Sequence, residues 1–431
     1  MRVTDFKASS AWSITLFLSF LYALSMLDRY ILALLAQSII TEFRISDEQM
    51  GLLLGAGFAI LYSVAGLPVA HFIDRGRRIP IVVGGVIIWS LSTMAAAFAT
   101  GFWTLGMSRA GVAIGEAVLT PAAISMIADL FPKEKRSAPV AVYAMSAAMM
   151  STGSIALGGL VFNLAQHISP MLDMAPWRIT LLLVGAPGIV LALLLGATTR
   201  EPARNAPVGK SHDQDEAGMK TFVNELRRDG ALFYPFYIGI AAVSLYIFGL
   251  ASWAPTILIR SYGLEESSAG YLLGMFGIPG AIGSALLWPA AADYLRRRRW
   301  KSPLPATMLL SAIALLPVIF IAPFVGSALA FAAGVGAAKL ANSASTLASL
   351  TIQHYGSGRV RGRLTAVFIL ASNVFGLSGG ALLVPIFANF WPGDPNGLIY
   401  GLAILGAVAA IFAIPSFWFA HRAAASIAAA D

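Results

Sequence analysis

The sequence predicts an all-α membrane protein with twelve transmembrane helices in two pseudo-symmetric six-helix bundles. Three observations support this: the composition, the spacing of the apolar runs and an internal repeat. Of the 431 residues, 58% are hydrophobic and only 12% are charged, with a mean hydropathy of +0.77. Charged residues make up about a quarter of ordinary soluble domains, so a soluble protein is excluded. Because apolar runs extend from end to end, a single-span receptor with large soluble domains is excluded too.

The apolar runs are each long enough for a spanning helix, which takes about 20 residues. Pro and Gly are frequent inside them, and membrane helices tolerate both because neighbouring helices and side chains satisfy the freed backbone groups. We place the helices at residues 12–36, 50–73, 79–99, 102–131, 137–165, 177–199, 232–260, 267–292, 304–323, 327–353, 361–388 and 397–420.

The longest polar stretch divides the chain near its middle. We predict an N-terminal bundle over residues 1–199, a cytoplasmic linker over 200–230 with an amphipathic helix near 219–228, and a C-terminal bundle over 231–431. An internal repeat supports two like halves, because the run Gly-Leu-Leu-Leu-Gly from Gly51 is matched by Gly-Tyr-Leu-Leu-Gly from Gly270. A duplicated bundle places its substrate site between the halves, near mid-membrane, and works by rocking one half on the other.

The basic residues predict the orientation. Most of the 29 Lys and Arg residues fall in loops on one side, and only Arg44, Arg178 and Arg260 fall in loops on the other. By the positive-inside rule, both termini are expected to be cytoplasmic, with the protein in the cell (inner) membrane. This distribution also argues against nucleic acid as the partner, despite a net charge of +8. The first apolar run lacks a signal-peptide cleavage site.

The sequence lacks the residue patterns that disulfide, metal-binding, ATP-driven and hydrolytic proteins require. The chain has no cysteine, and its five histidines are scattered, so we expect no disulfide framework and no metal site. It has no Gly-rich phosphate loop for an ATP-driven pump, no nucleophile elbow and no paired-carboxylate glycosidase site. We therefore expect neither an enzyme nor a bound cofactor.

Five ionisable residues fall well inside predicted spans: Asp28, Arg29, Arg109, Glu116 and Lys339. Burying Asp, Lys or Arg in hydrocarbon costs at least about 2.5–3.5 kcal/mol, so such residues usually mark a substrate or proton path. At ~1.5 Å per residue, Asp28 and Arg109 both lie roughly 10–13 Å below the outer surface. This similar depth predicts an ion pair between them.

Glu116 lies two helical turns beyond Arg109, on nearly the same face. No fixed partner is evident for Glu116, so we assign it as the main proton carrier. Asp28 is the second proton-coupling group, which titrates when Arg109 is diverted to an anionic substrate. The alternative is a permanent structural ion pair between the first and fourth helices. Arg29 either lines the cavity or pairs elsewhere in the bundle.

The second half offers fewer candidates for substrate binding. Lys339 is predicted to share a helical face with Asn342, Ser343 and Thr346, forming an inward-facing polar stripe whose cation contacts a headgroup. The alternative is that the hydroxyls only join helices. We also predict that three further residues line the cavity: Tyr246, Trp253 and Asn373.

The loop after the second predicted helix reads Asp74-Arg75-Gly76-Arg77-Arg78 and resembles the loop signature of the major facilitator superfamily, one residue short and with Ala70 in place of the usual Gly. An Asp at a helix end can pair with an Arg of a neighbouring helix in one conformation and release it in another. We assign a gating role to Asp74, Arg75, Arg77 and Arg78, and to Asp293 at the matching place in the second half. The alternative is that these charges only fix topology.

Further runs resemble the spinster family within that superfamily. They are Leu27-Asp28-Arg29-Tyr30, the run from Arg109 through Gly115-Glu116 to Ala117 with Pro121 and Ala128-Asp129-Leu130-Phe131-Pro132 after it, and Glu201-Pro202. The resemblance implies secondary active transport of lysolipid-like or sphingoid-phosphate amphiphiles coupled to protons, with roles for Asp28, Arg29, Arg109 and Glu116. The residues alone require only an amphipathic cavity with a cation and a carboxylate.

We therefore expect a proton-coupled secondary transporter that works by alternating access on lysolipid or sphingolipid-like substrates. One alternative is an exporter of drugs or other organic anions on the same scaffold. A second is a non-transporting membrane receptor or scaffold. The expected partners are an amphipathic small molecule or lipid, protons and the bilayer, and the protein is expected to be a monomer.

Overall fold

The computed structural model describes residues 8–204, 221–321, 324–358 and 360–430, and the regular structure within these ranges is helical throughout. Its contacts divide the chain into two compact units: unit 1 is Met1–Gly209 with Glu265–Gly274, and unit 2 is Lys210–Leu264 with Met275–Asp431. Within the described ranges, 11 helical stretches are long and apolar enough to cross a membrane. The predicted all-α, multi-span class is confirmed.

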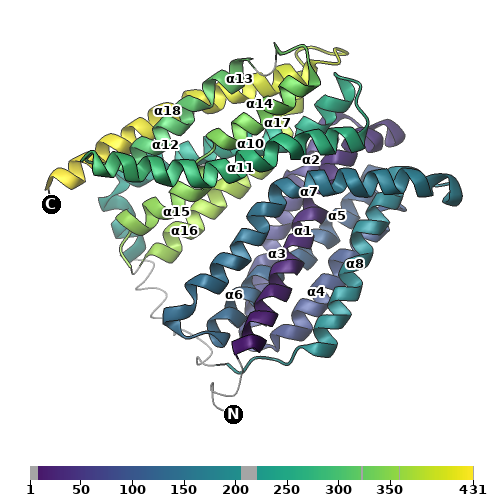
Figure 1. Ribbon diagram of the computed structural model, residues 1–431, viewed down its shortest axis with the longest axis horizontal. Helices are drawn as coiled ribbons and strands as arrows, with labels where there is room; N and C mark the ends of the chain where they lie inside the picture. Colours follow the sequence, from purple (N-terminus) through teal and green to yellow (C-terminus); the bar gives the residue numbers. More distant parts are fainter. Residues whose placement is uncertain (1–7, 205–220, 322–323, 359, 431) are drawn as a thin grey trace. The chain divides into compact units, whose positions relative to one another are not determined.

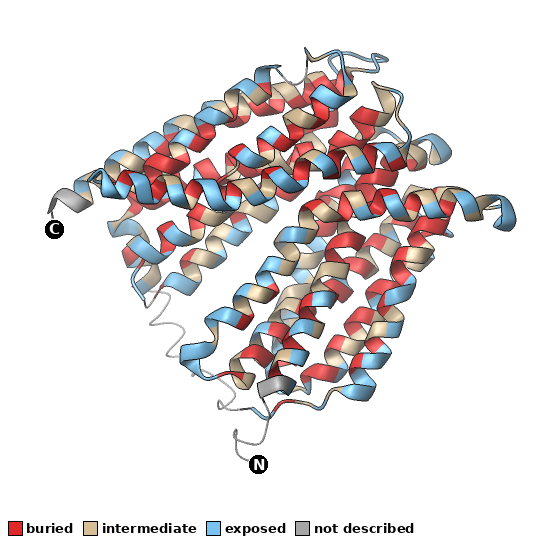
Figure 2. Ribbon diagram, viewed as in Figure 1, coloured by how far each residue is buried: buried red, intermediate tan, exposed pale blue. Residues whose placement is uncertain are grey.

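In unit 1, α1 packs on α7, and α4 packs on both α5 and α8 (Figure 1). Buried residues line the inner faces of these helices (Figure 2), and they include Leu18, Ile31 and Trp89. The elements are α1 (Ala8–Phe43), α2 (Asp47–Leu54), α3 (Ala56–Arg75), α4 (Arg78–Ala96), α5 (Phe102–Glu116), α6 (Leu119–Leu130), η2 (Lys133–Lys135), α7 (Ser137–Leu172) and α8 (Pro176–Thr198).

Local chemistry sets the ends of these helices. Ser46 caps α2: its Oγ accepts a hydrogen bond from the Gln49 N–H (3.2 Å), while the Gln49 side chain accepts one from the Ser46 N–H (2.9 Å). Helix α1 extends beyond the predicted 12–36 because the Glu42 carboxylate accepts hydrogen bonds from Trp177 Nε1 and Arg178 Nη2, each 2.6 Å long. These bonds fix the end of α1 to the start of α8.

In the second half of the chain, α10 packs on α18, η4 and α17. Residues 221–228 are helical, as predicted for this part of the linker, whereas residues 219 and 220 lie outside the described ranges. The elements are α10 (Gly230–Arg260), α11 (Glu266–Arg297), α12 (Pro303–Ala314), α13 (Leu316–Ile321), α14 (Ala328–Ala341), α15 (Ala344–Tyr355), α16 (Arg361–Leu370), the π-helix η4 (Ala371–Gly379), α17 (Gly380–Ala388) and α18 (Gly397–Ala430).

The predicted helix over 327–353 is interrupted, and this explains why one of the twelve expected spans is missing from the 11. It consists of α14 and α15, and neither reaches the length of a span. Nearby side chains satisfy the backbone groups freed at the break, as hydrocarbon requires. Trp288 Nε1 donates to the Leu340 carbonyl (2.8 Å), Ser284 Oγ donates to the Asn342 carbonyl, and the Ala344 N–H donates to Asn342 Oδ1 (3.1 Å).

The break overturns one prediction. Lys339 lies in the last turn of α14, Asn342 and Ser343 lie at the break, and Thr346 belongs to α15. Since Asn342 has an extended backbone (ψ 103°), the four residues do not share one helical face. The predicted continuous polar stripe is therefore wrong.

Candidate functional site

Four ionisable side chains meet inside unit 1. Asp28 and Arg29 come from α1, and Arg109 and Glu116 come from α5. Asp28, Arg109 and Glu116 are each at most 5% exposed, and Arg29 retains 17% of its side-chain surface. The group is called the charge cluster below. Arg29 is its most accessible member.

Arg29 and Glu116 form an ion pair. The Arg29 Nη2 and Nε atoms lie 2.6 and 3.2 Å from Glu116 Oε2. The expectation that Glu116 has no fixed partner is therefore wrong, and of the two alternatives for Arg29, pairing within the bundle is the one observed. The other carboxylate oxygen, Glu116 Oε1, is buried and has no hydrogen-bond partner among the described residues. That oxygen is free to take a proton.

Asp28 is held by a residue that the sequence analysis missed. Thr93 on α4 donates its hydroxyl to Asp28 Oδ2 at 2.5 Å. The predicted Asp28–Arg109 ion pair is not formed among the described residues, and the Asp28 carboxylate bonds α4 through Thr93. A Thr in an apolar helix usually bonds its own backbone, as Thr93 also does with the Trp89 carbonyl at 3.1 Å. The position of Thr93 in the third predicted helix did not mark it as a partner of Asp28.

Arg109 is the least satisfied group of the charge cluster. Its Nε and Nη2 atoms are buried without a hydrogen-bond partner among the described residues. Its Cζ lies 5.0 Å from the centre of the Phe58 ring, and Arg29 Cζ lies 4.8 Å from the same ring. Aromatic faces stabilise such cations only modestly, and unmade hydrogen bonds of a buried charge are costly. Arg109 is therefore poised to bind an anion.

A close backbone contact positions the charge cluster. Helices α4 and α5 approach so closely at Gly85 and Gly115 that a Cβ on Gly115 would lie 2.5 Å from the Gly85 carbonyl oxygen. The same Cβ would lie 2.7 Å from the Trp89 backbone nitrogen. Gly115 precedes Glu116, and Trp89 lies one turn before Thr93. The glycine contact therefore sets the spacing between the two helices that carry these side chains.

The residues predicted in the second half do not form an equivalent cluster. Trp253 is fully buried and donates from Nε1 to the Ala381 carbonyl at 2.8 Å. Tyr246 lines a cavity of about 10 Å³, which holds about one water molecule. Both side chains pack α10 against its neighbours, and their place on a substrate cavity stays a prediction. Asn373 is half-buried in η4, and π-helical turns are frequent at functional sites.

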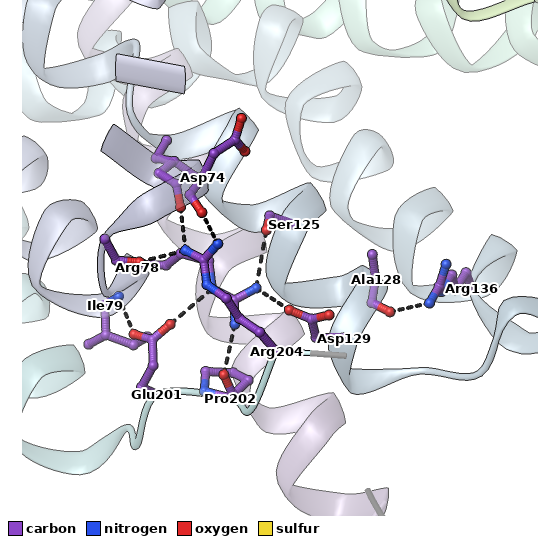
Figure 3. A network of polar contacts seen from close by, with 12 residues as sticks. Asp74, Arg78, Ile79, Ser125, Ala128, Asp129, Arg136, Glu201, Pro202 and Arg204 are labelled. Atoms are coloured by element: carbon purple, nitrogen blue, oxygen red, sulfur yellow. Dashed lines mark hydrogen bonds and ion pairs between the residues drawn. The ribbon is translucent and has the colours of Figure 1, made fainter. Parts of the chain in front are cut away.

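Among the predicted gate residues, Arg78 is the only one that is buried, and it is at the centre of a polar network (Figure 3). Its guanidinium donates to Glu201 Oε1 (2.9 Å), Ser125 Oγ (3.1 Å), Asp129 and the Pro202 carbonyl (2.8 Å). The second Glu201 oxygen accepts from the backbone N–H at the start of α4 (2.9 Å). The network ties the ends of α4, α6 and α8 together.

The other predicted gate residues are exposed. The Asp74 carbonyl accepts a hydrogen bond from Arg204, but its carboxylate forms no ion pair within the described part of the chain. Arg75 and Arg77 line separate surface cavities. Within the described residues, Asp293 forms one ion pair, with Arg296 at 2.7 Å on its own helix. A gating role for these residues stays a prediction.

The acidic partners of Arg78 could have been found from sequence. Asp129 lies in the last turn of a predicted span, and Glu201 follows another span directly, both on the same side of the membrane as the Arg78 loop. Acids at span ends facing an arginine-rich loop are natural ion-pair partners.

A bundle of spanning helices with buried, partly unsatisfied charges defines a membrane transport protein. The family model described as Major Facilitator Superfamily matches residues 18–379. The chain belongs to the major facilitator superfamily, and it is therefore a multi-pass membrane protein and a secondary transporter of small molecules, not an enzyme.

The individual relatives include an efflux pump and spinster proteins. The chain is 31% identical over 426 residues to an "MFS-type efflux pump" of Mycolicibacterium smegmatis, covering 95% of this chain and 92% of that protein. It is 29% identical over 264 residues to human "Protein spinster homolog 1", covering 60% of this chain and only 48% of that protein. A crystal structure of a bacterial homolog of spinster, in an inward-facing and unoccupied conformation, matches with a TM-score of 0.81 and 26% identity, covering 96% of this chain and 97% of that one. The predicted resemblance to the spinster family is confirmed.

Proposed function

We propose that this protein couples proton movement to the transport of amphipathic molecules by alternating access. The substrate class is a lysolipid or sphingolipid-like molecule with an anionic or zwitterionic headgroup and an apolar tail. One observation carries the proposal: Arg109 is a buried guanidinium with unused donors beside two carboxylates of the same unit. A phosphate or carboxylate headgroup would fill those donors in bidentate geometry, for which a guanidinium is well suited.

The two carboxylates supply the proton-coupling step. A proton on Glu116 would weaken its ion pair with Arg29, and both guanidinium groups could then bind an anionic headgroup. Loss of that proton would restore the pair and favour release of the substrate. Asp28, held by Thr93, is the second proton-binding group. Substrate and proton would in this way change the same set of ion pairs.

The remaining predicted residues complete the proposal. Lys339, Asn342 and Asn373 would contact the substrate from the second half, where the interrupted helix and the π-helix lie. Discontinuous helices often form substrate sites in transporters. Asp74, Arg75, Arg77, Arg78 and Asp293 would gate the cytoplasmic side. Both termini would be cytoplasmic in the cell membrane, with residues 200–230 linking two bundles of a monomer.

A second candidate function is export of drugs or other organic anions. The similarity to the mycobacterial efflux pump favours it, because that match covers nearly the whole of both chains. The spinster similarity and the free Arg109 donors favour anionic amphiphiles. Both candidates use the same charge cluster and differ in the cargo.

Flux measurements in proteoliposomes separate these candidates. The purified protein would be tested with a lysophospholipid, an organic anion without an acyl chain, and a cationic dye, each with and without an imposed pH gradient. We expect gradient-dependent flux of the lysophospholipid. Flux of the organic anion or the dye alone would favour the exporter, and flux of none of the probes would contradict both.

A further inference from the structure

A second cationic site lies at the other end of α4, away from the charge cluster. A cavity of about 830 Å³ opens between the first turns of α4 and the last turn of α8. Its lining includes Arg77, Val83, Ala197, Thr199 and Arg200. Arg78, at the start of α4, is 15 residues before Thr93, or roughly 22 Å along a helix axis at ~1.5 Å per residue. The cavity is therefore separate from the proposed transport site.

The cavity carries net positive charge. Arg77 and Arg200 are exposed, and neither forms a hydrogen bond or an ion pair within the described part of the chain. Glu201 also lines the cavity, but both of its oxygens are already engaged, one by Arg78 and one by the backbone N–H of Ile79. The two guanidinium groups of the lining thus outnumber its one carboxylate, and neither of them is paired within the described part of the chain.

The rest of the lining combines polar and apolar groups. The Thr199 side chain has no hydrogen-bond partner among the described residues, so its hydroxyl is available to donate. The Thr198 hydroxyl, in contrast, already donates to the Leu194 carbonyl at 2.6 Å. Val83, Gly196 and Ala197 supply an apolar wall along the two spans. A ligand with a phosphate beside an apolar chain matches this lining.

The position of the cavity identifies the occupant. Both α4 and α8 are membrane-spanning candidates, and the cavity lies where these two spans end. Phospholipid headgroups occupy that level of a bilayer, and basic residues next to span ends attract anionic lipids. We propose that this cavity binds the phosphate headgroup of an anionic membrane phospholipid, with Arg77 and Arg200 on the phosphate and an acyl chain along Val83.

Native mass spectrometry of the full-length protein tests the proposal. The protein would be titrated with phosphatidylglycerol or phosphatidylcholine of identical acyl chains. We expect the wild type to prefer phosphatidylglycerol about tenfold, as two basic groups near a headgroup would provide. The double variant Arg77→Gln, Arg200→Gln should lose that preference. The variant Arg297→Gln, Arg298→Gln removes the same charge at the end of α11 and should keep it.

Two further experiments distinguish a bound lipid from a free phosphate ion. Ala197→Leu fills the apolar wall without changing charge, and it should weaken phosphatidylglycerol binding several-fold. Inorganic phosphate should fail to displace the lipid at millimolar concentration. Equal binding of the two lipids by the wild type would overturn the proposal, as would equal losses in the two arginine variants. Unchanged binding by Ala197→Leu, or full displacement by phosphate, would also overturn it, because the cavity would then bind a free anion and not a lipid with an acyl chain.

Discussion

The two halves of this transporter differ in what departs from a regular apolar helix bundle: buried charges in the first half and irregular helices in the second. Unit 1 places four ionisable side chains on the regular helices α1 and α5, and a backbone contact at Gly115 holds α5 against α4, which carries Thr93. The second half has Lys339 as its only ionisable residue well inside a predicted span, but it interrupts one helix at Asn342 and widens another into the π-helix η4. Related bundles can thus specialise separately, one in charge and the other in backbone shape.

The ends of the helices show the same contrast. Arg78 is buried among acceptors from two segments, α6 and the residues after α8, whereas the Asp293–Arg296 pair in the second half lies on the surface of one helix. Removing one partner of a buried ionic network leaves the others unpaired. A surface pair is weakened by solvent and salt. The two arginines are therefore expected to differ strongly in their contribution to stability.

The largest expected effect is that of Arg78→Ala. Loss of this guanidinium leaves Asp129 and Glu201 without their shared partner, and we expect a cost of about 3–5 kcal/mol in the free energy of unfolding. Arg296→Ala, the matched control, should cost no more than about 1 kcal/mol. Denaturant unfolding in mixed micelles measures both. Similar costs for the two variants would remove the contrast between the two helix ends.

The next effect concerns the glycine contact. Gly115→Ala forces a methyl group into the Gly85 carbonyl and should cost about 1–3 kcal/mol through overpacking. In Gly106→Ala the new Cβ would lie 3.5 Å from a Leu53 methyl group, an ordinary contact, so this control should be nearly neutral. The same unfolding assay applies. If Gly115→Ala were as stable as Gly106→Ala, close approach of α4 and α5 would not be what positions the charge cluster.

A change at Arg109 should act on substrate binding more than on folding. Arg109→Lys keeps the charge but loses the planar pair of donors, so we expect roughly tenfold weaker substrate affinity, or about 1.4 kcal/mol. Equilibrium binding of the lysophospholipid measures the effect, with a thermal unfolding scan as the folding control. Unchanged affinity would remove Arg109 from the headgroup site.

The smallest expected change in stability is at the helix break in the second half of the chain. Trp288→Phe removes the donor to the Leu340 carbonyl at the helix break, and we expect a loss of about 1 kcal/mol. Trp300→Phe changes a half-exposed indole and serves as the control, with an expected change within about 0.5 kcal/mol. Equal stabilities would mean that the break does not depend on this bond.

The sequence predicted the spans well and the contacts between them poorly. Long apolar runs identify helices because hydrocarbon allows few other structures. The same periodicity gives only an approximate depth and direction for each side chain, and this is why Asp28 was matched with Arg109 although it bonds Thr93. The partner of Glu116 was adjacent to Asp28 in sequence, and the orientation of α1 about its axis, which periodicity gives only approximately, decides which of the two residues pairs across to α5.

The helix break was missed for a related reason. No Pro or Gly marks the Asn342-Ser343 step, and the donors that stabilise it, Ser284 and Trp288, come from another helix. An Asn-Ser pair inside an apolar run was the available signal, since both residues favour local hydrogen bonds over helix continuation. Tertiary partners decided the outcome.

Proton-driven flux through wild-type and Glu116→Gln proteoliposomes is the most direct test of whether the charge cluster couples protons to transport. Glu134→Gln, at an exposed position of the same unit, is the control. With an imposed pH gradient, lysophospholipid flux should rise several-fold in the wild type and in Glu134→Gln, and it should not respond in Glu116→Gln. Equal responses of all three proteins to the gradient would contradict a proton-coupling role for Glu116.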